Sequence, residues 1–150
     1  MKLVHWNKTE SDCGIVAVTN AAAWCNIDAN YEKVEKVAKS CGYGKSGVYH
    51  FQFIHLIKKL KIPAKRFRPK TLQDLEKQLY KGKLFILFYT PSDVLKGSGH
   101  VITAFVDHTG SIRIVNPGET RNTWRRFVND LRENGVKNFA AWQVPQRQVK

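Results

Sequence analysis

The sequence predicts an α+β domain in which helices precede an antiparallel sheet. Two observations indicate this class. Apolar residues recur at helical spacing up to about residue 82, and from residue 84 short runs rich in Ile, Val, Phe and Thr replace them, as in strands. The 150 residues contain no repeat, low-complexity tract or linker, and a chain of this length suits one compact domain. We therefore expect a single domain over residues 1–150.

The first expected helix begins at Cys13, with Ser11 or Asp12 as its N-cap, and its nearly continuous apolarity through Trp24 predicts that it is buried. Thr71 and Asp74 have the spacing of a capping box, and Gly82 is placed to end the helix that follows them. The expected helices cover residues 13–24, 31–40, 50–60, about 71–82, and 123–134.

Strands are expected where β-branched and aromatic residues gather. The third and fourth strands should form a hairpin across Asp107 to Gly110, and Phe139 to Val144 should close the fold. The expected strands cover residues 64–68, 84–90, 100–106, 111–116 and 139–144.

Three residues have the chemistry of a thiol hydrolase. Cys13 stands at a predicted helix start, where free backbone amides and the helix dipole favour a thiolate. His100 opens a strand, and an imidazole there can take the thiol proton and return it to a leaving amine. Asn116 ends the paired strand just before Pro117, where its amide oxygen can accept the imidazole N–H. Each also has a plain structural interpretation: a buried cysteine, a strand-capping histidine and a turn-forming asparagine.

The Asp-Cys-Gly motif at Cys13, the Gly-His motif opening the strand at His100, and Asn116 before Pro117 resemble the C39-type, papain-like cysteine peptidases. The resemblance implies a papain-like fold in which a helix carrying the catalytic cysteine packs on an antiparallel sheet. It also implies that Cys13 attacks an amide carbonyl, that His100 moves the proton, and that Asn116 orients His100. The family has Gln as oxyanion donor six residues before the nucleophile, where this sequence has Asn7, the same amide on a shorter arm.

The excess of basic residues is relevant to the kind of partner that the protein could bind. Lys and Arg number 25 against 12 Asp and Glu, a formal net charge of +13. Residues 58–70 hold seven basic and no acidic residues, and a second basic group contains Arg121, Arg125, Arg126 and Arg132. A solvated, solubilising surface and an anion-binding surface explain this equally well.

Other features exclude several protein classes. The longest apolar run, residues 84–89, is far shorter than the roughly 20 residues of a membrane span, and the first residues lack the apolar stretch of a signal peptide, so the expected compartment is the cytoplasm. Cys25 and Cys41 complete neither a disulfide framework nor a CxxC pattern. His5, His50, His55 and His108 have no partner at metal-ligand spacing, so we expect no metal and no cofactor.

The sequence thus predicts a cysteine peptidase or amide hydrolase with a Cys13, His100 and Asn116 triad, acting on a peptide or isopeptide-like substrate. The positive net charge of the protein would favour an acidic substrate. A transferase with the same triad differs only in what resolves the thioester. The alternative is a catalytically silent papain-like module whose basic surface binds nucleic acid or an acidic protein. Trp124 could shield the contact between His100 and Asn116, but a core tryptophan is favoured.

Overall fold

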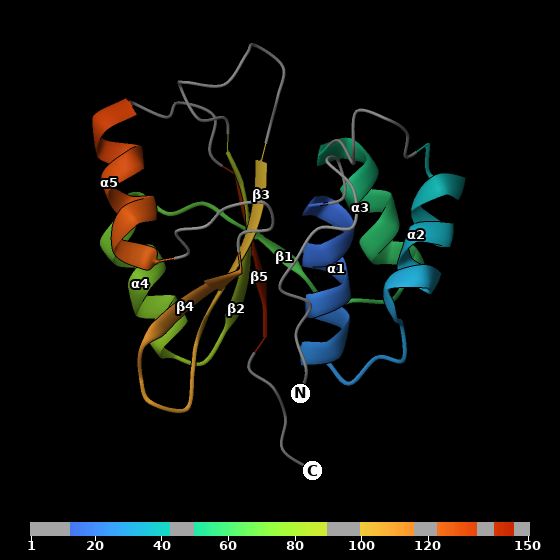
Figure 1. Ribbon diagram of the computed structural model, residues 1–150, viewed down its shortest axis with the longest axis horizontal. Coiled ribbons are helices and arrows are strands. Elements are labelled where there is room, and N and C mark those ends of the chain that lie inside the picture. Colours follow the sequence, from blue (N-terminus) through green and yellow to red (C-terminus); the bar gives the residue numbers. More distant parts are fainter. Residues whose placement is uncertain (1–12, 43–49, 90–99, 116–122, 135–139, 146–150) are drawn as a thin grey trace.

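The structure, a computed structural model, describes residues 13–42, 50–89, 100–115, 123–134 and 140–145. This part of the chain forms three layers, with three helices on one face of a central sheet and two on the other (Figure 1). In chain order the elements are α1 (Cys13–Trp24), α2 (Tyr31–Ser40), α3 (His50–Lys59), β1 (Lys65–Phe67), α4 (Leu72–Tyr80), β2 (Leu84–Tyr89), β3 (His100–Val106), β4 (Ile112–Val115), α5 (Trp124–Asn134) and β5 (Ala140–Val144).

The sheet has the strand order β1-β5-β2-β3-β4, and every neighbouring pair is antiparallel. The expected hairpin between β3 and β4 is confirmed, with Gly110 at a φ of 84° in its turn, a left-handed conformation that glycine adopts without strain. The capping box is also confirmed, because the Thr71 hydroxyl accepts the Asp74 backbone N–H and the Asp74 carboxylate accepts the Thr71 N–H. The expected N-caps of α1, Ser11 and Asp12, lie outside the described residues.

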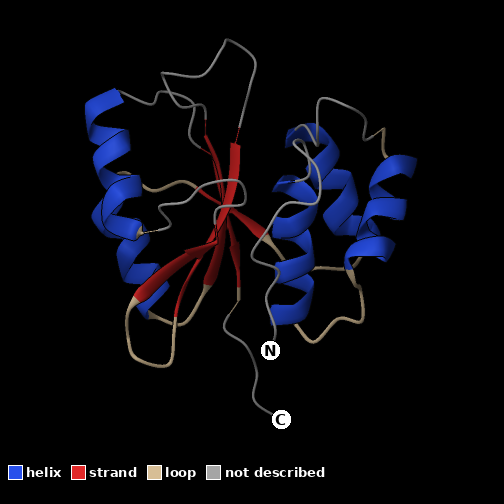
Figure 2. Cartoon of the chain, in the orientation of Figure 1, coloured by secondary structure: helices blue, strands red, loops and turns tan. Residues whose placement is uncertain are grey.

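Both faces of the sheet are buried, and the alternation of side chains along each strand separates two cores. One core joins α1, α2 and α3 to the face that carries Ile86, Val101 and Trp142. The other joins α4 and α5 to the face that carries Leu87, Ile102 and Ala141. Figure 2 shows the helices on the two sides of the strands. Because β2 is covered on both faces, its sequence is continuously apolar instead of alternating.

The first helix is the most deeply buried element of its layer. Ten of its 12 residues are buried, and small side chains allow it to approach α2, β2 and β3 closely. The Trp24 indole N–H donates to the Pro145 carbonyl at 2.9 Å, and the Trp24 ring lies 6.0 Å from that of Phe105 in β3. The expected α+β architecture, with the helix of Cys13 packed on an antiparallel sheet, is therefore confirmed.

A polar network holds the β3–β4 turn. The Asp107 carboxylate accepts bonds from the Thr109 hydroxyl, from the Arg113 Nε at 2.7 Å, and from two backbone N–H groups of the turn. The Thr109 hydroxyl, and after it the Arg113 guanidinium, hold the pKa of the Asp107 carboxyl well below its usual range.

The Asp107→Asn substitution should lower the free energy of unfolding at pH 7. Because the pKa of Asp107 is lower in the folded state, its contribution is complete above about pH 4, the ordinary range of an unfolded aspartate, and is lost as the pH falls toward the folded value. Urea unfolding of wild type and variant should differ more at pH 7 than at pH 3. Asp28→Asn, which removes an exposed carboxylate outside the turn, is the control; a pH-independent difference for Asp107→Asn would contradict the assignment.

Candidate active site

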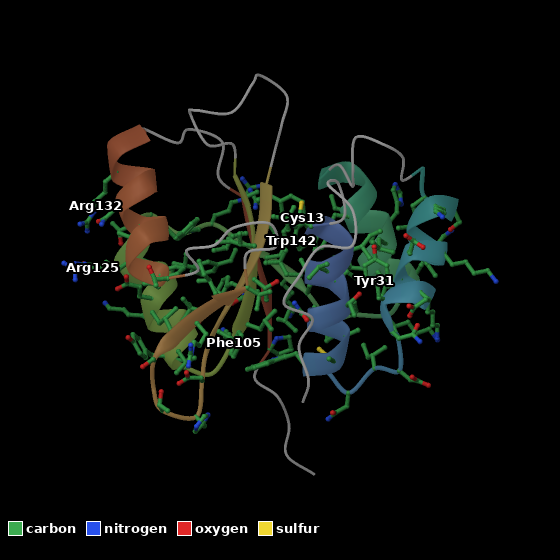
Figure 3. The ribbon with its side chains drawn as sticks, in the orientation of Figure 1. Cys13, Tyr31, Phe105, Arg125, Arg132 and Trp142 are labelled. Atoms are coloured by element: carbon green, nitrogen blue, oxygen red, sulfur yellow. The ribbon has the colours of Figure 1, made fainter. Side chains whose placement is uncertain are left out.

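Cys13 is the first residue of α1 and is half-buried at the edge of the core between α1 and the sheet. Figure 3 shows its sulfur near the start of α1, on the side that faces the sheet. The first backbone amides of a helix have no partners within it and carry the positive end of its dipole. This position therefore favours a thiolate and provides N–H donors beside the sulfur.

His100 is the first residue of β3 and pairs with Tyr89 of β2. Elements α1 and β3 pack against each other, and Figure 1 shows that both begin at the same edge of the molecule. At their other ends the rings of Trp24 and Phe105 are in contact. The two elements therefore run in the same direction over their length.

The lengths of these two elements match. With a rise of about 1.5 Å per residue, Cys13 precedes Trp24 by about 16 Å along α1. With a rise of about 3.3 Å per residue, His100 precedes Phe105 by about 16 Å along β3. The described stretch of α1 from Cys13 to Trp24 and the stretch of β3 from His100 to Phe105 therefore have about the same length, and the two elements pack against each other.

Asn116 and Asn7 lie outside the described residues, so the structure does not test their expected roles. The last described residue before Asn116 is Val115, which pairs with Thr103, three residues after His100. The strand that leads to Asn116 is thus the direct neighbour of the strand that His100 opens.

The sequence did not reveal a cluster of aromatic rings beneath this edge. Phe53 of α3 lies 4.9 Å from Phe88 of β2 and 5.5 Å from Trp142 of β5, measured between ring centroids. Phe88 pairs with Val101, one step from His100, and is only partly buried. Phe53, Phe88 and Trp142 come from elements far apart in the sequence, so no sequence spacing signals that Phe53 contacts the other two rings.

The remaining candidates have structural roles. Trp124 is buried between α4, α5 and the sheet, and its indole N–H donates to the Glu76 carboxylate at 2.8 Å, as expected of a core tryptophan. Burial raises the pKa of the Cys25 thiol, which makes that sulfur a poor nucleophile at neutral pH.

Within the described ranges, no group of three or more His, Cys, Asp or Glu side chains is arranged to bind a metal ion. None of the helices described has the length and apolarity that a membrane span requires.

Two solved structures share this architecture. The peptidase domain of Streptococcus ComA, a bi-functional ABC transporter involved in a quorum sensing pathway, has a TM-score of 0.62 and 17% sequence identity, over 94% of this chain and 96% of that one. A Bacillus anthracis protein described as a C39-like peptidase has a TM-score of 0.61 and 14% identity, over 99% of this chain and 96% of that one. No family model and no curated protein matches the sequence.

These two structures cover nearly the whole chain, and at this level of identity they establish its fold. The chain has a C39-like, papain-like α+β fold.

Proposed function

We propose that this protein is a cysteine peptidase or amide hydrolase with Cys13 as nucleophile and His100 as general base. The observation that carries the proposal is the shared edge at which α1 and β3 begin, with a half-buried thiol on the first residue of one and a histidine on the first residue of the other. The C39-like fold of the solved peptidases agrees with it.

In the proposed reaction the Cys13 sulfur attacks the carbonyl carbon of an amide while His100 accepts the thiol proton. The resulting tetrahedral oxyanion is stabilised by backbone amides at the start of α1 and by the Asn7 side chain. When the C–N bond breaks, His100 gives the proton to the leaving amine and a thioester remains on Cys13. Water, deprotonated by His100, then hydrolyses the thioester and regenerates the thiol. Asn116 would hold the imidazole in the required tautomer.

The helix carrying Cys13 is rigid, and this suits the reaction. Ile15, Val16 and Val18 are fully buried, so the nucleophile stands on a backbone fixed by packing instead of on a loop. A nucleophile held in place loses little freedom on reaching the transition state. The aromatic cluster below the site would keep water away from its apolar side.

Cys13 should react with iodoacetamide faster than Cys25 and Cys41, because only Cys13 combines a helix start with a histidine partner. His100→Ala should slow the alkylation of Cys13 at least about tenfold and leave the other two cysteines unchanged. Peptide-mapping mass spectrometry after timed labelling measures all three rates in one sample. Equal rates at the three thiols would contradict the proposal.

Asn7 can be tested separately from the nucleophile. Acylation by a p-nitrophenyl ester passes through an oxyanion, whereas alkylation by iodoacetamide does not. Asn7→Ala should therefore slow acylation of Cys13 by about 10²-fold or more while leaving alkylation unchanged. Asn7→Gln, which keeps the amide donor, should retain more of the acylation rate. Equal slowing of both reactions by Asn7→Ala would show that Asn7 acts through the fold.

A further inference from the structure

The strongest charged feature outside the candidate active site is the segment that runs from the last turn of α3 to the start of α4. We name it the basic strip, and it comprises Lys58, Lys59, Lys61, Lys65, Arg66, Arg68 and Lys70. Six of these side chains are exposed, and Arg66 is partly buried with its guanidinium donating to the Ala141 carbonyl. Figure 1 shows this segment passing from the three-helix layer, through β1 at the edge of the sheet, to α4 in the opposite layer.

No neighbouring acid neutralises the strip within the part of the chain that the structure describes. The ion pairs found there join Lys39 to Glu35 and Arg113 to Asp107, and neither involves the strip. Asp74, the carboxylate that follows the strip, is occupied by backbone N–H groups of Lys70 and Thr71. Partial burial and the nearby Arg68 charge lower the pKa of Arg66, as expected where cations are crowded.

Protection of an edge strand does not account for the whole strip. β1 pairs only with β5 in the described sheet, and lysines on such an edge discourage pairing with other chains. That purpose needs charges only within residues 65–67. Here the cations begin in the last turn of α3, at Lys58, and continue past β1 to Lys70. Their distribution follows the path of the chain across the molecule instead of the strand edge.

We propose that the basic strip binds the phosphate backbone of a double-stranded nucleic acid, without sequence preference and independently of Cys13. Residues 61–70, if fully extended, would span at most about 30 Å, close to one turn of the duplex, and they include the three-residue strand β1. Exposed lysine ammonium groups and the exposed Arg68 guanidinium are suited to phosphate oxygens, and neutralising phosphates releases counterions from the duplex.

The composition of the strip favours a duplex over other anionic partners. Single-stranded nucleic acids bind through exposed aromatic rings that stack on bases. The one aromatic residue of this segment, Phe67, packs against Phe85 with ring centroids 5.4 Å apart. Interfaces with proteins are depleted of lysine and rely on exposed apolar anchors. The exposed large apolar side chain found among the described residues is Tyr80, which lies outside the strip.

The test compares two triple variants that change the net charge equally, from +13 to +10 (13 − 3). The strip variant carries Lys61→Gln, Lys65→Gln and Arg68→Gln. The control variant carries Lys36→Gln, Lys77→Gln and Arg132→Gln, all at exposed positions on α2, α4 and α5. Equal thermal midpoints would show that both variants fold. Binding to a fluorescein-labelled 20-base-pair DNA duplex is followed by fluorescence anisotropy from 50 to 200 mM salt.

Wild type should bind the duplex, with log K falling linearly against log salt. The strip variant should bind at least about tenfold more weakly at 50 mM salt, and its salt slope should be smaller by two to three, as expected for three lost phosphate contacts. The affinity of the control variant for the duplex should fall less than about threefold, because salt screens charges that lie far from the binding surface.

Three outcomes would overturn the proposal. Equal weakening of both variants would assign the binding to net charge. Tighter binding of the corresponding single strand would assign the strip to unpaired nucleic acid. Polyglutamate could also compete with the labelled duplex as effectively as unlabelled duplex does at the same concentration of charge. That result would assign the basic strip to acidic polypeptides. A Cys13→Ala protein should bind as wild type does, so this result and the test of catalysis are separable.

Discussion

The packing of α1 against β3 is the constraint on which the rest of the structure depends. A helix buried almost all around can exist only with apolar elements on several sides, and here α2, β2 and β3 provide them. The sheet in turn needs apolar cover over the face that carries Ile86, Val101 and Trp142, and α1 provides part of that cover. One interface therefore stabilises the domain and determines where residue 13 stands relative to residue 100.

The helical layer and the sheet contribute different functional groups to the proposed chemistry. The helical layer provides a thiol at a helix terminus, where the local field favours the charged form. The sheet provides a histidine at a strand terminus, beside the strand that leads to Asn116. Strand termini carry functional side chains well, because pairing holds the backbone while the end remains open to a ligand. Val101, Ile102 and Thr103 are all buried, so packing holds β3 in place immediately after His100.

Residue patterns predicted the elements because their signals are local. The helical period identified α2 and α5, the continuous apolarity of residues 13–24 identified a buried helix, and the Thr71 and Asp74 spacing identified a cap that the structure contains. The strand order could not be predicted in this way, since β5 inserts between β1 and β2 through contacts of residues far apart in sequence. For the same reason the cluster of Phe53, Phe88 and Trp142 was missed. The proposed triad came from motif order along the chain, and its side-chain geometry depends on segments beyond the described residues.

The proposed chemistry requires that the Cys13 sulfur and the His100 imidazole meet. Treatment with 1,3-dibromoacetone measures this directly, because the reagent alkylates a thiol first and then joins it to a nucleophile within reach of a three-carbon bridge. We expect mass spectrometry of the digested protein to find the Cys13 peptide linked to the His100 peptide, and we expect prior blocking of Cys13 to abolish the link. Alkylation of Cys13 with no link, or with a link to a different histidine, would contradict it.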